Sequence, residues 1–249
     1  PALGGIQTFS IELARATAQL GEEVAVVASR QEGAQQIDAD LPFIVIRVPT
    51  RGSYPTAAMN LSAGAQQSLD LLETPPRCLV ATKWSPEGPA ATLAYGRLRC
   101  PMMLIGHGGE FCHTGGNLFK WLMQRIVLKR MHLCLANSHY TADLFAGAGV
   151  PDERIRVIYG GVRPEEFEVS EQRARQVREE MGIGDAPMLV TASRLVERKG
   201  HDTIIRALPR LRERFPDLAW IVTGEGPMEQ ALVDLAEELG VAQTARFIG

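Results

Sequence analysis

Short apolar runs alternate with segments of helical periodicity along almost the whole chain of 249 residues. Runs such as Leu133–Ala136 and Met188–Ala192 have the length of buried strands. Each run is followed by a segment with helical periodicity, as Met188–Ala192 is followed by the amphipathic segment Thr203–Phe215. Strands that alternate with helices indicate βα units, whose strands lie parallel in one sheet. The pattern therefore predicts an α/β fold.

A change of composition divides the chain. Between Arg163 and Asp185 the sequence becomes charged and helical, with little strand propensity. We place a domain boundary there and predict domains 1–165 and 166–249. The second domain would hold only three strands, too few for a finished parallel sheet, and Gly4-Gly5 lacks the strand that should precede it. We therefore expect the chain to be truncated at both ends.

Charge and apolar content exclude some classes of protein. The net charge of −3 gives no basic field of the kind that marks a nucleic-acid binder. No apolar stretch approaches the roughly 18 residues that span a bilayer. Three of the four cysteines lie in or beside apolar strand-like runs, as reduced core residues do, which favours a cytoplasmic location. The four are Cys78, Cys100, Cys112 and Cys134. Cys112-His113 near His107 suggests a metal, but no further ligand is identifiable.

Polar or glycine-rich loops follow four of the predicted strands, and Gly4-Gly5 makes a fifth such loop. The four are His107–Glu110, Asn137-Ser138, Arg194–Gly200 and Gly224–Gly226. The carboxyl ends of parallel strands share one edge of a sheet, where open α/β proteins bind their ligands. Two such sheets facing each other would bring these loops together in an interdomain cleft.

The segment Ser193–Asp202 carries two fixed cations, Arg194 and Lys199, between a predicted strand and a predicted helix. The start of a helix adds free N–H groups and a partial positive charge, both of which favour an anion. We hypothesise that this loop grips a phosphate or a diphosphate. A solvated basic loop is the alternative that these residues leave open.

The other loops are less specific. His107, between two glycines, suits hydrogen bonding or proton transfer, or it is a structural histidine that caps a turn. Glu110 is a partner for it or a plain loop carboxylate. Gly224-Glu225-Gly226 begins like a dinucleotide fingerprint, but Glu229 stands at the third glycine, which argues against an NAD-dependent oxidoreductase. Neither a Walker pattern nor a serine-hydrolase elbow occurs.

Six motifs follow one another in a fixed order. They are Gly-Gly-Ile-Gln (Gly4–Gln7), Gly-His-Gly-Gly-Glu (Gly106–Glu110), Asn-Ser-His-Tyr-Thr (Asn137–Thr141), Val-Ile-Tyr-Gly-Gly-Val (Val157–Val162), Ser-Arg-Leu-Val-Glu-Arg-Lys-Gly-His-Asp (Ser193–Asp202) and Val-Thr-Gly-Glu-Gly-Pro (Val222–Pro227). Together they resemble a retaining glycosyltransferase of family 4. The first and fifth are most similar to phosphatidylinositol mannoside mannosyltransferases, although other GDP-mannose and UDP-sugar enzymes share both.

This resemblance implies the GT-B fold of two facing Rossmann-like domains, an acceptor-side domain and a donor-binding domain that is incomplete here. It implies that Arg194 and Lys199 bind the donor diphosphate, with Gly4 and Gly5 approaching it. His107 would lie near the transferred sugar, and Gly224, Glu225 and Gly226 would face the nucleoside. His107, Arg194 and Lys199 are then the catalytic candidates. No cofactor and no metal are expected, because the two cations replace a metal.

The partners follow from the same resemblance. They are a nucleotide-diphosphate sugar, with GDP-mannose favoured over a UDP-sugar, and a lipid or saccharide acceptor. A lipid acceptor would bring the protein into peripheral contact with the inner face of a membrane. However, the basic residues of Asn117–Met131 are spread around that predicted helix, unlike those of an interfacial helix.

Two further expectations concern activity. The chain ends before the glutamate-rich motif that binds the ribose and sugar of the donor in this family, so we expect the chain alone to be inactive. The alternative from another class is a non-catalytic α/β nucleotide-binding module. Such a module would keep Arg194 and Lys199 but would have no functional role for His107.

Overall fold

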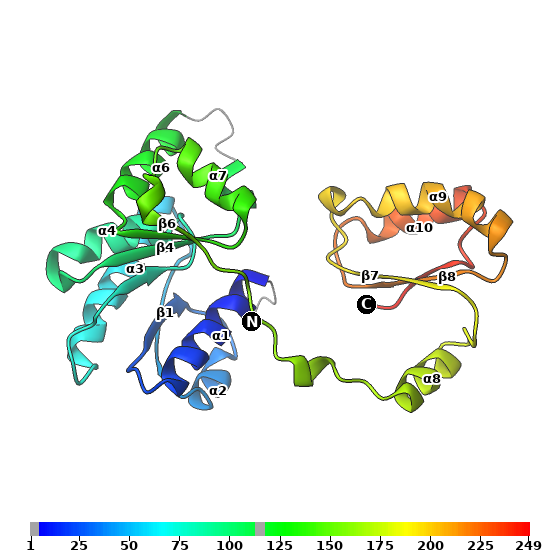
Figure 1. Cartoon of the computed structure of the whole chain (residues 1–249), viewed down its shortest axis with the longest axis horizontal. Coiled ribbons are helices and arrows are strands. Elements are labelled where there is room, and N and C mark those ends of the chain that lie inside the picture. The colour runs from blue at the N-terminus through cyan, green and yellow to red at the C-terminus, as the bar shows by residue number, and fades with distance from the viewer. Residues whose placement is uncertain (1–4, 113–117) are drawn as a thin grey trace. The chain divides into compact units, whose positions relative to one another are not determined.

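The computed structural model describes residues 5–112 and 118–249. It separates into two compact units, Pro1–Val162 (unit 1) and Arg163–Gly249 (unit 2), each of which packs helices against a sheet (Figure 1). All strand pairs between described residues are parallel. The predicted α/β fold with parallel sheets is therefore confirmed.

Unit 1 contains two sheets, with strand orders β1-β2 and β3-β4-β5-β6 among the described residues. Its strands are β1 (Ala25–Ser29), β2 (Ile44–Val48), β3 (Leu79–Ala81), β4 (Met102–Gly106), β5 (Leu133–Ala136) and β6 (Ile155–Val157). Its α-helices are α1 (Gly5–Gln19), α2 (Ala34–Ala39), α3 (Tyr54–Gln67), α4 (Glu87–Leu98), α5 (Gly109–Cys112), α6 (Leu118–Arg130) and α7 (His139–Gly147). Short 3₁₀ turns lie at Ser68–Asp70 and Asp152–Arg154.

The core of unit 1 lies between the β3–β6 sheet and its helices. Leu104 of β4 packs in one cluster with Val127 and Leu128 of α6 and with Phe145 of α7, and all four side chains are buried. At about 25 cal/mol for each Å² of apolar surface removed from water, such side chains are the main source of the stability of the unit. Their burial also fixes the carboxyl edge of the sheet, where β4 and β5 end.

Unit 2 has one sheet among its described residues, in the order β7-β8-β9. Its strands are β7 (Met188–Ala192), β8 (Ala219–Thr223) and β9 (Ala245–Phe247), and its helices are α8 (Glu171–Glu180), α9 (His201–Arg214) and α10 (Glu229–Glu238), with 3₁₀ turns at Pro164–Phe167 and Glu197–Lys199. Helices α9 and α10 cover one face of the sheet (Figure 1). Trp220 and Val222 of β8 point into that layer, whereas Ala219 and Ile221 pack with Ile183 on the other face.

Some local expectations differ from the structure. Helix α2 was not expected, because Ala34–Ala39 is short and half of its residues are polar, and only Ala34 is buried. A proline inside a helix removes an N–H donor and commonly kinks or shortens the helix, yet α9 continues past Pro209 to Arg214. The buried side chains of Ile205 and Leu208 hold α9 against the sheet on either side of the missing N–H. Cys78 is exposed and is not a core residue, whereas Cys100 and Cys134 are buried.

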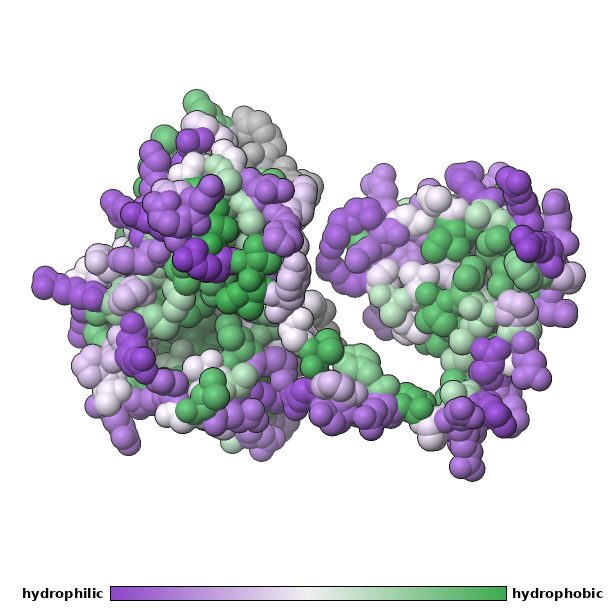
Figure 2. Space-filling model, viewed as in Figure 1, coloured by the Kyte–Doolittle hydropathy of each residue, from purple (hydrophilic) through white to green (hydrophobic). Residues whose placement is uncertain are grey.

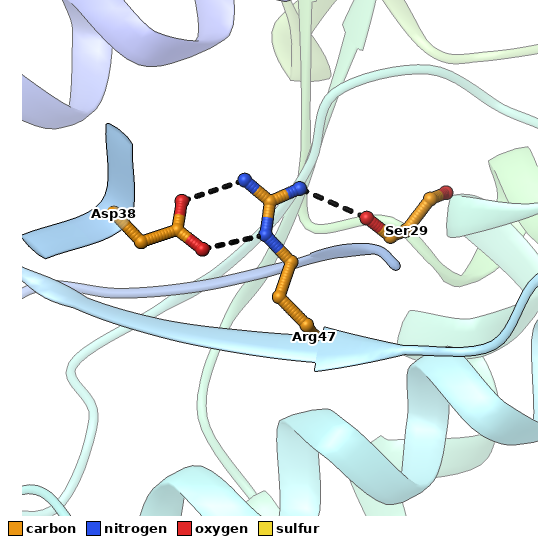
Figure 3. Close-up of polar contacts among 3 residues, drawn as sticks. All are labelled: Ser29, Asp38 and Arg47. Atoms are coloured by element: carbon orange, nitrogen blue, oxygen red, sulfur yellow. Dashed lines mark hydrogen bonds and ion pairs between the residues drawn. The ribbon is translucent and has the colours of Figure 1, made fainter. Parts of the chain in front are cut away.

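A bidentate ion pair ties the edge of unit 1 together (Figure 3). The guanidinium of Arg47 on β2 donates to both carboxylate oxygens of Asp38 on α2, at 2.8 and 2.6 Å. It also donates to the carbonyl oxygen of Ser29 at the end of β1, at 2.8 Å. The Arg47 hydrogen bonds hold the pKa of Asp38 below its usual value. The fork geometry of arginine thus joins three elements at one point.

Candidate functional site

Arg194 and Lys199 both lie in the loop between β7 and α9, and both are exposed. The loop contains the 3₁₀ turn Glu197–Lys199 and ends at Gly200, whose φ of 67° places it in the left-handed region that glycine adopts readily. No described side chain caps α9. The N–H of Thr203 donates to the carbonyl of Gly200, and Asp202 lies in the same first turn. The other N–H groups at the start of this 14-residue helix follow a loop with two cations that form no ion pair with a described residue. This arrangement suits an anion.

The loop that follows β8 holds this cationic loop in place through backbone hydrogen bonds. The N–H of Leu195 donates to the carbonyl of Glu225 at 3.0 Å, and the N–H of Met228 donates to the carbonyl of Leu195 at 3.1 Å. The side chain of Leu195 is fully buried in the α9–α10 layer. Arg194 is therefore attached to a residue that is fixed by both its backbone and its side chain.

The two glycines of the β8 loop are required by this contact. A Cβ atom on Gly226 would lie 2.3 Å from the carbonyl oxygen of Leu195, and one on Gly224 would lie 2.4 Å from that of Ser193. Gly224 also has a φ of 121°, which side-chain-bearing residues rarely adopt. Both glycines thus serve close packing of two loops, and Glu225 between them is exposed. A contact with a nucleoside remains a prediction for these three residues.

In unit 1, His107 follows the last residue of β4. Its Nε2 lies 2.9 Å from the carbonyl oxygen of Thr82, which follows β3. A carbonyl oxygen can only accept, so Nε2 of His107 is the donor in this contact. The edge of Phe9 on α1 meets the imidazole, with the ring centroids 5.4 Å apart. Two neighbouring segments therefore fix the orientation of His107.

The segment around His107 rests on the start of α7. The N–H of Asn137 donates to the carbonyl of Gly106 at 3.1 Å, and Thr141 Oγ1 donates to Asn137 Oδ1 at 2.7 Å. Ser138 caps α7 by accepting from the N–H of Thr141 at 3.2 Å. The Asn-Ser-His-Tyr-Thr motif is thus a support for the histidine loop.

The remaining predicted site residues are placed less fully. Gly5 is the first residue of α1, whereas Gly4 lies outside the described residues. Glu110 belongs to α5, but its side chain is not among those described. Among residues 5–112 and 118–249, no group of three or more histidine, cysteine or acidic side chains could hold a metal ion. The structure therefore brings together Arg194, Lys199 and the Gly224–Gly226 turn in unit 2, and His107 with Phe9 of α1 in unit 1.

The family comparison decides among the classes that this geometry allows. Residues 3–166 match the family model described as Glycosyltransferase Family 4. The chain belongs to glycosyltransferase family 4. Residues 173–249 match a second model, Glycosyl transferases group 1. The resemblance carried by the six sequence motifs is therefore confirmed.

Curated relatives of this family 4 chain include two mycobacterial enzymes named GDP-mannose-dependent alpha-(1-6)-phosphatidylinositol monomannoside mannosyltransferase. The protein of Mycolicibacterium smegmatis is 33% identical over 99% of this chain, and that of Mycobacterium tuberculosis is 29% identical over 100% of it. In both cases the chain spans 64% of the length of the relative.

Solved structures show the same fold. HepE of Anabaena, crystallised in complex with UDP and glucose, superposes with a TM-score of 0.79 at 19% identity, over 99% of this chain and 66% of that one. WaaG, described as a glycosyltransferase involved in lipopolysaccharide biosynthesis, gives a TM-score of 0.65 at 16% identity, over 100% of this chain and 67% of WaaG. The family 4 chain therefore has the α/β fold of GT-B glycosyltransferases.

The sequence did not single out the loop of the family 4 chain that follows β3. There Lys83 Nζ lies 3.3 Å from Glu87 Oε1, while Glu87 Oε2 is buried without a hydrogen-bond partner among the described residues. Burial raises the pKa of Glu87 above its usual value, against the opposing charge of Lys83. The sequence signal that could have identified this loop is its position directly after a strand. The same loop supplies the Thr82 carbonyl that holds His107.

The described helices were also searched for membrane spans. None of those in residues 5–112 and 118–249 is both long and apolar enough to cross a membrane.

Proposed function

We propose that the complete protein transfers a hexose from a nucleotide-diphosphate sugar to a lipid or saccharide acceptor, with retention of configuration. GDP-mannose is the favoured donor, because the names of two relatives specify it, and a UDP-sugar is the second choice, because HepE was crystallised with UDP. The single observation that carries this proposal is the fixed, cationic loop at the uncapped start of α9.

In this proposal residues 166–249 belong to the donor-binding domain. Negative charge grows on the diphosphate as its bond to the sugar breaks, and Arg194 and Lys199 stabilise that charge. Their loop is already held by Leu195, so little reorganisation is needed at the moment of transfer. The turn Gly224-Glu225-Gly226 faces the nucleoside. With two cations on the diphosphate, transfer needs no metal ion.

Residues 1–165 belong to the acceptor-side domain. Gly4 and Gly5 approach the diphosphate at the start of α1, which has no acidic residue in its first turn to repel an anion. His107 lies near the transferred sugar, with its ring held by Thr82 and Phe9. Glu110 is a secondary candidate on the same loop. The family relation supports retention, and we identify no carboxylate nucleophile.

A membrane-facing acceptor is supported by the surface of α6. Five of its large apolar side chains are exposed, namely Leu118, Phe119, Trp121, Leu122 and Ile126. The last turn adds Lys129 and Arg130, and apolar surface is visible on both units in Figure 2. Exposed apolar side chains suit insertion into a lipid interface, although the basic residues of α6, which include Lys120 and Arg125, do not collect on one face as they do in an interfacial helix. We propose that the protein acts at the inner face of the cytoplasmic membrane through this helix.

The membrane proposal is tested by sedimentation of the complete protein with vesicles. Replacing Phe119 and Leu122 by Ser should weaken binding to vesicles that contain anionic phospholipid, because apolar area that enters the interface is lost. Leu93 of α4, exposed to 55%, provides the control, since Leu93→Ser should leave binding unchanged. If the α6 variant and the Leu93→Ser control lose vesicle binding to the same extent, α6 is not the membrane-binding element.

The transfer proposal is tested by the kinetics of the complete protein with GDP-mannose and UDP-glucose. Arg194→Ala or Lys199→Ala should raise the barrier by about 2–4 kcal/mol, as the loss of one preorganised donor does elsewhere. Arg198→Ala is the matched control, because Arg198 is an exposed cation in the same 3₁₀ turn with no predicted role. If all three substitutions reduce kcat/KM equally, the effect is one of general charge and the proposed grip is wrong.

The chain of 249 residues alone should transfer no sugar, because it spans only 64% of the length of the mannosyltransferases that it resembles. The measurement is sugar release and transfer by this chain beside the complete protein. Sustained transfer by the 249-residue chain would contradict this part of the proposal.

A further inference from the structure

A side-chain hydrogen bond joins the two ends of the cationic loop. Ser193 directly follows β7, and His201 is the first residue of α9. Ser193 Oγ and His201 Nε2 lie 3.1 Å apart. The stretch between them carries Arg194 and Lys199, so this bond closes the base of the loop from which both cations extend. Backbone contacts with the β8 loop hold the same segment from the other side, at Leu195.

His201 is an unusual choice for its position. The side chain is 2% exposed, and its Nδ1 has no hydrogen-bond partner among the described residues. Its ring lies beside Trp220 in the core, with the centroids 6.5 Å apart. A buried nitrogen without a partner costs free energy that a leucine of similar size would not. Among the described residues, the bond to Ser193 is the one polar contact of this ring that could offset the cost.

The charge state of the ring agrees with such a role. Burial, assisted by the nearby cation of Lys199, lowers the pKa of His201, while Asp202 opposes the shift. A neutral imidazole bonds to a hydroxyl equally well as donor or as acceptor, so the contact with Ser193 needs no charge. The loop is thereby closed without adding a further fixed charge beneath the anion site.

We infer that Ser193 and His201 are positioning residues that set the affinity of the loop for a donor diphosphate. This inference rests on the proposed function, because it requires that Arg194 and Lys199 hold that diphosphate. Without the bond, the two ends of the loop can separate, and the cations must be ordered when the ligand binds. Ordering side chains and loop upon binding reduces affinity even though every contact to the ligand remains available.

The test is calorimetry of the complete protein with GDP, repeated with UDP because either base suits the proposal. Ser193→Ala and His201→Leu should each weaken diphosphate binding about fivefold, the effect of one typical hydrogen bond. The double variant should bind no more weakly than the worse single variant, because both changes remove the same contact. His201→Gln, which keeps a side-chain amide for Ser193, should recover part of the loss.

Two controls separate positioning from stability. GMP lacks the second phosphate, so its binding should change less than that of GDP in the same variants. Ser170→Ala removes a comparable bond from unit 2, the cap of Ser170 Oγ on the N–H of Arg173 at 3.2 Å. It should lower the midpoint of thermal unfolding and leave GDP binding unchanged. Ser193→Ala is small enough to fold even if His201→Leu does not.

The outcomes distinguish this inference from the proposed function. If Arg194→Ala weakens GDP binding but Ser193→Ala does not, the inference is wrong and the proposed grip stands. If Arg194→Ala and Ser193→Ala both leave binding unchanged, the diphosphate grip itself is wrong, and the inference fails with it. Equal weakening of GDP and GMP by Ser193→Ala also overturns it, since the effect would then lie outside the second phosphate.

Discussion

The two candidate loops are held in different ways. In unit 2 the cationic loop is fixed mainly by backbone contacts, where Leu195 bonds to the β8 loop and Gly226 permits the approach. In unit 1 the segment of His107 has a backbone bond from Asn137 to Gly106 and is otherwise held through side chains, including the Phe9 ring and the Phe145 ring that packs against Gly106. A backbone contact cannot move without moving its strand, whereas a side chain can rotate. The cationic loop of unit 2 should therefore be more sensitive to substitution than the His107 segment of unit 1.

The largest effect is expected at Gly226. Replacement by Ala would place a Cβ atom 2.3 Å from the Leu195 carbonyl oxygen, and both loops would have to separate. We expect a loss of about 3 kcal/mol in the free energy of unfolding of unit 2, measured by urea denaturation. Gly96→Ala in α4, where a Cβ atom meets no atom within 4 Å, should instead stabilise unit 1 slightly. A tolerated Gly226→Ala would show that the loop contact is soft.

A smaller effect is expected at Gly106. An added Cβ atom would lie 2.6 Å from Cζ of Phe145, a side-chain atom that can shift at the cost of repacking the core. We expect a loss of about 2 kcal/mol in the free energy of unfolding of unit 1. Gly147→Ala, at the end of α7 with no atom within 4 Å of the new Cβ, is the control. A loss larger than that at Gly226 would reverse the comparison between the two loops.

The smallest effect is expected at the ion pair of Arg47 and Asp38, again a side-chain contact of unit 1. Asp38→Asn should cost about 1.5 kcal/mol near neutral pH, the lower range for hydrogen bonds to a charged group. Because the folded pKa of Asp38 is lowered, its contribution is complete above the unfolded pKa of about 3.9 and is lost as pH falls through the folded pKa. Urea denaturation over a pH series measures both effects.

The matched control for this pair is Asp40→Asn, since Asp40 is exposed and lies two residues further along. The Asp40 variant should keep the acid-dependent loss of stability that Asp38→Asn removes. If both variants retain that loss between pH 4 and more acidic conditions, the pair does not stabilise unit 1 through its charge.

Sequence patterns predicted those features of the fold that depend on residues close together in the chain. The apolar run Met188–Ala192 became a strand with the same bounds, and Ser138 became the cap of α7, because length, polarity and capping chemistry are local properties. The burial of Glu87 and the contact of His201 with Ser193 could not be predicted. Each arises when segments on different elements meet, and nothing in the neighbouring residues records that meeting.

Candidate site residues divide along the same line. Arg194 and Lys199 were identifiable because their loop follows a strand and precedes a helix. His107 was identifiable as a residue but not in its environment, since Thr82 and Phe9 come from distant parts of the chain. The functional roles assigned to Arg194, Lys199 and His107, and to Gly4, Gly5, Glu110 and the Gly224–Gly226 turn, all stay predictions.

The close packing of Gly224 and Gly226 has a consequence for reading related sequences. In this chain the two glycines are explained by close packing against a loop about thirty residues earlier in the sequence. A spaced glycine pair is therefore not by itself a sign of a bound nucleotide. Glu225 joins that contact through its backbone carbonyl, so the contact itself places no demand on the Glu225 side chain. We expect related sequences to keep both the glycine pair and the Ser-Arg-Leu segment or to lose both, because the two loops pack against each other. The packing contact does not restrict which residue stands between the glycines.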